Sequence, residues 1–200
     1  MSKIAIDARI INSSTGRYVE RLIHYLEEID QENHYLILVR KKDLEFYKPT
    51  NPNFEIVEAE FDDYSFAEQI GLKKLLDELK PDLVHFCMPQ QPILYTGKHV
   101  TTMHDLTLLN TYNSDKNYFM FKSKQLVGRF VFKRIAKTSA QILTPSQFTK
   151  DAYAKFAKIT PNKINLTYEA ADKSDSTPLP YADLTNKEYI LYVGSQSDYK

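Results

Sequence analysis

The chain has 200 residues, of which 42% are hydrophobic and 26% are charged, a composition ordinary for a globular protein with one good core. Its 26 basic residues balance its 26 acidic ones, so no global field favours nucleic acid and we expect no nucleic-acid partner. No apolar run approaches the ~18 residues that a membrane span needs, and the opening MSKIAID is typical of a strand rather than a signal peptide. These features predict a cytoplasmic protein.

In chain order, the hydrophobic period alternates between that of strands and that of helices. The first helix has an apolar stripe from Val19 to Ile29; we expect Thr15 or Ser14 to cap it, and Pro81 to stop the second helix. Strands are predicted at 3–7, 34–40, 54–59, 82–86, 99–103, 140–144 and 163–168, and helices also at 65–80, 116–137 and 146–156.

Strands that alternate with helices indicate an α/β fold with a doubly wound, mainly parallel sheet of the Rossmann-like kind. The Asn-Gly and Asp-Gly dipeptides that are typical of hairpins are absent. We therefore assign residues 1–170 to one such domain.

The chain changes character after this domain. Residues 171–187 are rich in Asp, Ser, Pro and Thr and have little periodicity, so they are predicted to form a linker. Tyr189 to Val193 (YILYV) then has the composition of a buried strand, and Gly194 follows it. A single strand is not stable by itself, so we expect residues 188–200 to begin a second, truncated α/β domain.

Polar residues that follow predicted strands are the candidates for binding and catalysis, because ligands of parallel sheets bind outside the carboxyl ends of the strands. His104 and Asp105 follow the strand that ends at Met103, and a histidine there can act as acid, base or hydrogen-bond donor. A locally hydrogen-bonded loop histidine is the alternative. Ser146 and Glu169 follow the next two strands.

The turn NSSTGRYV, which contains Thr15 and Gly16, lies at the same predicted edge and precedes a helix. Its backbone amides can cradle a phosphate, but it lacks both GxGxxG and the Walker Gly-Lys-Ser/Thr pattern. The alternative is that Ser and Thr only cap the helix while Gly16 eases the turn.

The other reactive side chains favour structural roles. Cys87 stands alone and lies in an apolar run, which indicates a reducing compartment and a buried, inert thiol rather than a nucleophile. His85 lies inside a strand and is expected to be a core histidine, whereas His24 and His34 are expected to be structural or solvated. No spacing of His, Cys, Asp and Glu indicates a metal site.

The region from Lys116 to Lys150 contains no Asp or Glu. Its basic residues are interleaved with aromatic ones, so the helix at 116–137 can lie peripherally on an anionic membrane surface or receive an anionic acceptor. The alternative is a surface helix whose aromatic side chains face the core and whose lysines face water.

Several of these segments carry a family resemblance. The opening IAIDARIINSSTGRYVERLIHYL, the strand PDLVHF, and the segments VTTMHDLTLL and AQILTPSQFTKDAY resemble the N-terminal domain of the retaining glycosyltransferases of GT-B fold known as family 4, or group 1. The match is close to the bacterial mannosyltransferase-like branch. KINLTYEAAD and YILYVGSQSDYK resemble the approach to the donor-binding domain and its first strand.

This resemblance implies transfer of a sugar, with retention, from a nucleotide-diphosphate sugar to a glycan or lipid-linked acceptor, as in polysaccharide biosynthesis. It implies no metal and no cofactor besides that co-substrate. The family's His-Asp-Leu histidine corresponds to His104, which would lie beside the transferred sugar as the catalytic residue. The residues expected to bind donor or substrate are Thr15, Gly16, Asp105, Ser146 and Glu169.

Two departures from the family pattern bear on activity. The family's turn often has paired glycines, whereas Ser14 and Thr15 precede Gly16 here. The family's basic residues and paired glutamates belong to its C-terminal domain, the expected partner of this one, so residues 1–200 alone are expected to be inactive. Alternatives from other classes are a non-catalytic sugar- or nucleotide-binding module, a dinucleotide oxidoreductase, which the missing GxGxxG disfavours, and a membrane-surface adaptor.

Overall fold

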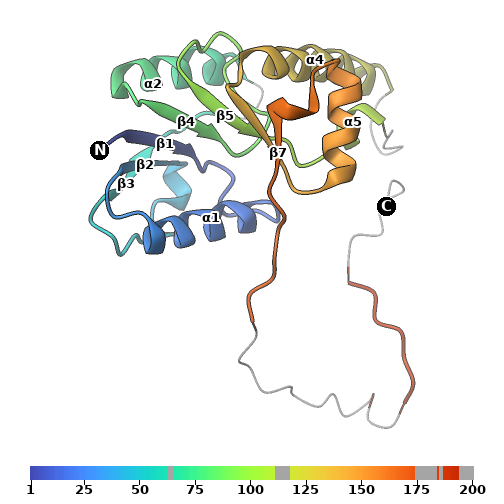
Figure 1. Cartoon of the computed structure of the whole chain (residues 1–200), viewed down its shortest axis with the longest axis horizontal. Helices are drawn as coiled ribbons and strands as arrows, with labels where there is room; N and C mark the ends of the chain where they lie inside the picture. Colours follow the sequence, from blue (N-terminus) through green and yellow to red (C-terminus); the bar gives the residue numbers. More distant parts are fainter. Residues whose placement is uncertain (63–64, 111–117, 174–183, 185–186, 194–200) are drawn as a thin grey trace.

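The structure is a computed structural model that describes residues 1–62, 65–110, 118–173, 184 and 187–193. Its centre is a parallel sheet of seven strands in the order β3-β2-β1-β4-β5-β6-β7 (Figure 1). The strands are β1 (Lys3–Asp7), β2 (His34–Val39), β3 (Phe54–Glu58), β4 (Leu83–Phe86), β5 (His99–Thr102), β6 (Gln141–Thr144) and β7 (Ile164–Leu166). The predicted α/β class and parallel sheet are confirmed.

The helices lie on both faces of this sheet. They are α1 (Gly16–Ile29), the π-helix η2 (Glu68–Leu72), which continues into α2 (Lys73–Leu79), then α3 (Thr107–Asn110), α4 (Tyr118–Thr138) and α5 (Gln147–Ala157), with short 3-10 turns η1 (Lys41–Asp43) and η3 (Pro161–Lys163). α1 packs on one face through a core that includes Val19 and Ile23, whereas α2 and α4 cover the other (Figure 1).

Strand register decides which side chains share a face. Asp7 pairs with Phe86 and Phe86 with Thr101, so these residues point towards the α2 layer. Ile6 and His85 pair in the same way and point towards α1. The central strands β1, β2 and β4 are largely buried on both faces, which explains why their segments are nearly continuous apolar runs, whereas the edge strands β3 and β7 are partly exposed.

The structure departs from the sequence predictions in three places. Ile29 was placed on the buried stripe of α1, but it lies at the helix end and its side chain is exposed. The predicted helix at 65–80 is π-helical over Glu68–Leu72, and helix α3 had no predicted counterpart. A π-helix of five residues and a helix of one turn are both too short to change the hydrophobic periodicity of the sequence, so neither was predicted.

The predicted strand at Tyr189–Val193 is not formed. Residues 187–193 have no regular secondary structure, and their side chains are exposed, with Ile190 completely so. A strand needs a neighbour for its backbone hydrogen bonds, and within the described part of the chain none pairs with this segment. The division into a domain at 1–170, a linker at 171–187 and a second domain from 188 remains a prediction.

Candidate active site

The order of the strands places the site. From β1 the chain first moves outward through β2 and β3, and then returns to add β4 on the other side of β1. Adjacent loops therefore leave in opposite directions at the carboxyl ends of β1 and β4, which is where open parallel sheets bind ligands. Glu169 follows β7 at this same edge, as His104 follows β5.

The turn between β1 and α1 is closed by Ser13, which is not one of the two predicted capping residues. The Ser13 hydroxyl accepts a hydrogen bond from the Gly16 amide at 3.0 Å, whereas Thr15 has helical backbone angles and makes no side-chain cap. Neither Thr15 nor Ser14 is therefore the cap that was predicted. Both have lone hydroxyls of the same type, so composition alone could not single out Ser13.

Gly16 has a steric role in this turn. A Cβ built on it would lie 2.1 Å from the Ile11 carbonyl oxygen and 2.2 Å from that of Ile10. Such contacts involve backbone on both sides, so only glycine lets α1 begin this close to the preceding turn. Gly16 therefore eases the turn, as the structural alternative predicted. A contact between its backbone and a diphosphate remains a prediction.

His104 is held in a defined orientation at the end of β5. Its Nε2 lies 3.0 Å from the Cys87 carbonyl oxygen, which can only accept, so Nε2 carries a proton. The edge of the Tyr18 ring packs on the imidazole with centroids 4.9 Å apart. The side chain is 15% exposed, enough to meet a ligand while its position is fixed by packing.

The other ring nitrogen of His104 faces a carboxylate. Nδ1 lies 3.4 Å from Oε1 of Glu169, whose side chain is half exposed. Both neighbours of the ring nitrogens, the Cys87 carbonyl and the Glu169 carboxylate, are hydrogen-bond acceptors. A ligand hydroxyl that replaced Glu169 would meet Nδ1 directly, since Nε2 is occupied. The structure therefore brings two of the predicted site residues together.

Ser146 reaches His104 through one intermediate side chain. It caps α5 by accepting from the Thr149 amide at 3.1 Å, and its hydroxyl donates to Oγ1 of Thr149 at 3.0 Å. Thr149 in turn donates to the His104 carbonyl oxygen at 3.1 Å. The N-terminus of α5 is thus fastened to the backbone that presents the imidazole. Thr149 was not predicted, although it stands three residues after the cap, at the usual capping distance.

Asp105, another predicted site residue, forms its hydrogen bond within its own loop. Its Oδ1 accepts from the Thr107 amide at 2.8 Å, which starts the short helix α3, and its side chain is exposed. No hydrogen bond or ion pair joins Asp105 to the His104 ring among the described residues. Its predicted role in binding remains open.

A buried polar chain lies directly behind His104. The Tyr18 hydroxyl is 3.1 Å from Oγ1 of Thr102, and the same oxygen is 2.8 Å from Nε2 of His85. Burial raises the pKa of Tyr18 and lowers that of His85 to about 4, so both side chains are neutral near pH 7. His85 is therefore the packed core histidine that the sequence predicted. Tyr18, which packs on the His104 ring, is a further site residue that was not predicted.

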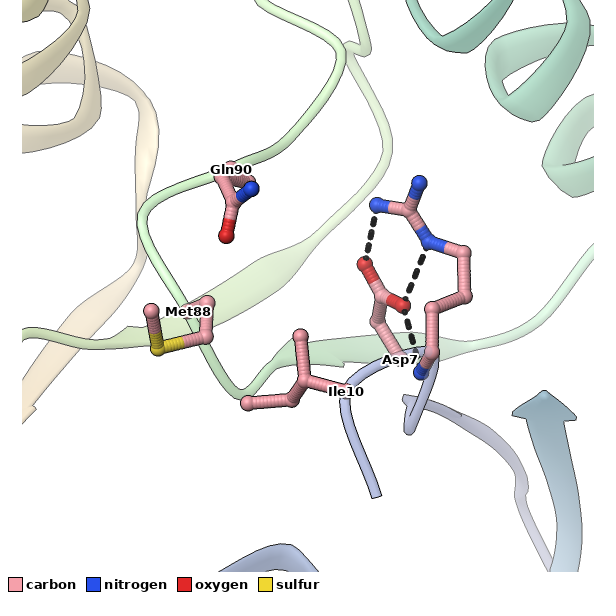
Figure 2. Close-up of a pocket in the computed structure, with 5 residues that line it drawn as sticks. Asp7, Ile10, Met88 and Gln90 are labelled. Atoms are coloured by element: carbon pink, nitrogen blue, oxygen red, sulfur yellow. Dashed lines mark hydrogen bonds and ion pairs between the residues drawn. The ribbon is translucent and has the colours of Figure 1, made fainter. Parts of the chain in front are cut away.

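A charged cluster borders a small pocket at the β1/β4 switch point. The pocket is lined by Asp7, Arg9, Ile10, Met88 and Gln90 (Figure 2). Arg9 donates to both Asp7 oxygens at 2.8 Å, and its Nη2 also lies 2.8 Å from Glu68.

Burial alone would lower the pKa of Arg9, but the two carboxylates outweigh it and raise that pKa. Since two anions already surround this cation, Arg9 is not available to bind a phosphate.

The segment after β7 is tied to α1. Asp172 lies 2.8 Å from Arg17 and 2.9 Å from Arg21, and it accepts from the Tyr25 hydroxyl at 3.1 Å. Its pKa is lowered because hydrogen bonding and the two guanidinium groups outweigh its partial desolvation. Together with Glu169, this contact holds the start of the predicted linker along the edge that carries His104.

The remaining candidates are inert or solvated. Cys87 is completely buried and burial raises its pKa, so it is the unreactive thiol that was predicted. His24 and His34 are partly exposed and lie near Glu28 and Glu55, at 3.2 and 3.7 Å. Within the described ranges, no three His, Cys, Asp or Glu side chains gather as a metal site would require.

Comparison with known families favours one class of function over the others. The family model described as Glycosyltransferase Family 4 matches residues 15–174, which include the glycine turn, His104, Ser146 and Asp172. The chain belongs to this glycosyltransferase family. The comparison with curated proteins gave no match. Membership supports sugar transfer in general and fits the parallel α/β sheet.

The basic helix of this family 4 domain agrees only in part with the core alternative, and its contact with a membrane surface or an anionic acceptor remains a prediction. Phe132 is buried as the core alternative requires, but Phe130 is exposed on the outer face. Among the residues that the structure describes, no helix combines the length and apolarity that crossing a bilayer requires.

Proposed function

We propose that this chain supplies the acceptor-side half of a retaining, mannosyltransferase-like family 4 enzyme that acts in the cytoplasm. The donor is a nucleotide-diphosphate sugar, and the acceptor is a glycan or a lipid-linked saccharide. The observation that carries the proposal is the fixed imidazole of His104 at the carboxyl end of β5, with its Nδ1 turned towards the open edge.

In this proposal His104 binds the transferred sugar through Nδ1. Cys87 and Tyr18 keep the ring from rotating, so a sugar hydroxyl that displaces Glu169 meets a preoriented group. There the ring hydrogen-bonds that hydroxyl through Nδ1 and helps to stabilise the charge that develops as the diphosphate departs. Fixing the donor in this way lowers the barrier without reorganisation during the reaction.

The other predicted residues are proposed to line the approach to His104. The turn with Thr15 and Gly16 lies at the start of α1, next to Tyr18, and is proposed to face the diphosphate or the acceptor. Ser146 positions His104 through Thr149, whereas Glu169 and Asp105 are proposed to receive sugar hydroxyls. No step of this proposal needs a metal ion.

The test is an assay of the full-length gene product against a panel of UDP-, GDP- and ADP-sugars. His104→Ala is expected to lower turnover of the preferred donor about 100-fold, which corresponds to ~2.7 kcal/mol of lost transition-state stabilisation. His24→Ala is the matched control, because His24 lies on the outside of α1 with Glu28 as its ion-pair partner. The anomeric configuration of the product, measured by NMR, tests retention.

Unchanged turnover in His104→Ala would remove the catalytic role from this residue. A product of inverted configuration would refute retention while leaving sugar transfer intact. If no donor were turned over and none bound in calorimetry, the domain would instead be a non-catalytic module of the same fold.

A further inference from the structure

A pocket near the start of α1 has no role in the proposed reaction. Its volume is about 190 Å³, and it lies between the turn before α1, the first turns of that helix and the segment after η1. We call it the Phe46 pocket; the residues that line it are Ile11, Asn12, Ser13, Arg17, Glu20 and Phe46.

One buried carboxylate holds two walls of the Phe46 pocket together. The side chain of Asp43 accepts from Nδ2 of Asn12 at 3.0 Å, and its backbone carbonyl accepts from the Phe46 amide at 3.0 Å. Leu44 and Tyr47, which flank Phe46 in the chain, pack against the core beneath α1. Phe46 itself is 46% exposed, so an anchored segment presents its ring outwards.

The polar side chains around this ring suit a ligand that is rich in hydroxyl groups. Arg17 donates to Glu20 at 3.2 Å, and because both side chains are partly exposed, ligand hydroxyls can replace this bond at little cost. Ser13, whose oxygen accepts from a backbone amide of the turn, can still donate its hydroxyl proton. Asp43 orients the Asn12 amide, whose carbonyl oxygen can accept. The pocket therefore offers both donors and acceptors, as hydroxyl groups require.

Charge and size disfavour a phosphate or a nucleotide in the Phe46 pocket. Arg17 is the one cation among its six residues, and it already lies 3.2 Å from Glu20 and 2.8 Å from Asp172. The volume of about 190 Å³ is below the ~300–1,000 Å³ of pockets that enclose drug-sized ligands. A single neutral ring fits both observations.

Two consecutive residues of α1 connect this pocket to the His104 site. Arg17 lines the Phe46 pocket, whereas the Tyr18 ring packs on the His104 imidazole with centroids 4.9 Å apart. A ligand that lies against His104 can therefore extend around the start of α1 and reach Phe46.

We propose that the Phe46 pocket binds one neutral sugar ring. The C–H groups on a face of this ring pack on the negative π face of Phe46, and its hydroxyls bond to Arg17 and Glu20. That the ring belongs to the acceptor, at least one unit away from the hydroxyl that reacts, rests on the proposed function. The pocket then selects acceptors of two or more sugar units over monosaccharides.

Ligand-observed NMR of the 200-residue chain tests this binding in the absence of any donor. The neutral probes are the methyl α-glycosides of mannose, glucose and galactose, and methyl glucuronide is the anionic comparison. We expect one or more neutral probes to bind with a Kd of about 1 mM, which is typical for a ligand of this size. Phe46→Ala and Phe46→Leu should each weaken binding about tenfold, because leucine is apolar but has no aromatic face.

Two control variants separate the Phe46 pocket from other surfaces. Phe66→Ala removes a phenylalanine outside the pocket that is 87% exposed, and His104→Ala changes the proposed catalytic residue but leaves the pocket intact. Both should bind the neutral probes as the unmodified chain does. Circular dichroism of every variant verifies that it is folded.

Steady-state kinetics of the full-length gene product tests the role of the pocket in acceptor choice. Phe46→Ala should raise KM for a disaccharide acceptor about tenfold with kcat unchanged, because the pocket binds the ground state and the transition state equally. KM for a monosaccharide acceptor should stay the same, since a single ring at His104 does not reach Phe46.

Three binding results would overturn the proposal: no neutral probe binds, both Phe46 variants bind as tightly as the unmodified chain, or the glucuronide binds more tightly than every neutral probe. Loss of binding in His104→Ala with retention in Phe46→Ala would assign the probe to the His104 site instead. An equal rise of KM for both acceptors would refute selection by acceptor length. Absence of turnover in the unmodified protein would refute the proposed function, while probe binding would still decide whether the pocket takes a sugar.

Discussion

Replacing Arg9 by Met tests whether the buried charged cluster at the switch point fastens η2 to the turn after β1. Arg9, Asp7 and Glu68 have side chains that are at most 7% exposed, and three hydrogen bonds of 2.8 Å join them. Without the guanidinium, two carboxylates remain buried side by side with no cation from Arg9. Removing one partner of such a pair costs about 3–5 kcal/mol, so we expect a loss of that size in the free energy of unfolding.

Urea denaturation of four proteins measures this coupling: the unmodified chain, Arg9→Met, Glu68→Leu and the double variant. Glu68→Leu should cost less, about 2 kcal/mol, because the Arg9–Asp7 pair survives it. The double variant should lose less than the sum, by about 2 kcal/mol, since the residues are in direct contact.

Lys48→Met is the control, because Lys48 and Glu45 form a pair whose side chains are 75% and 85% exposed. Such pairs contribute about 0–1 kcal/mol. If Arg9→Met cost no more than Lys48→Met, or if the two replacements in the cluster were additive, the argument would be wrong.

Two further predictions concern Gly16 and His85. Gly16→Ala should destabilise the chain by about 3 kcal/mol in urea denaturation, because its Cβ would strike backbone at Ile10 and Ile11. The pKa of His85 is about 4 in the folded chain and ~6.5 when unfolded, so the unfolded state binds the extra proton between these values. Stability is therefore expected to fall by about 3 kcal/mol as the pH drops from ~6.5 to ~4, measured by urea denaturation across that window, and His85→Gln should flatten the dependence.

Each of these two predictions has its own control. Gly128→Ala meets only the end of the Leu108 side chain at 2.8 Å, and alanine favours a helix, so this variant should be neutral or more stable. Equal effects of the two glycine replacements would contradict the steric argument. For His85, the reference is His24→Gln, and an unchanged pH profile in His85→Gln would show that other groups set the slope.

The strands were predictable because the central ones are buried on both faces and the edge ones on one. Every predicted strand in residues 1–170 exists and agrees to within two residues at each end, and hairpin signals were correctly absent. The π-helix at Glu68–Leu72 was not predicted, and its Glu68 makes a tertiary contact with Arg9 that no local pattern contains. The strand predicted at Tyr189–Val193 is not formed. Its composition is typical of a strand, but no strand in the described part of the chain pairs with it.

The candidate site was predictable where position along a strand decides it. His104, Ser146 and Glu169 meet at the carboxyl edge because their strands are parallel neighbours. Tyr18 and Thr149 were not predicted. Tyr18 packs on the His104 ring and Thr149 donates to the His104 carbonyl oxygen, and contacts between residues so far apart in the sequence are known only once the fold is known. The choice of Ser13 over Ser14 and Thr15 as cap depends on backbone angles that composition does not encode.

The strand order has a consequence for biosynthesis. β4, β5, β6 and β7 each pair with the strand made just before them or, for β4, with β1, which is already complete. At ~5–20 residues per second, translation of each connection takes from under one second to about eight seconds before the next strand emerges. The sheet can therefore grow vectorially from β1 towards β7, and only the crossover from β3 to β4 has to traverse finished strands. This crossover contains η2, whose Glu68 forms the buried ion pair with Arg9 after β1, so the pair fastens the one crossover that does not join neighbouring strands.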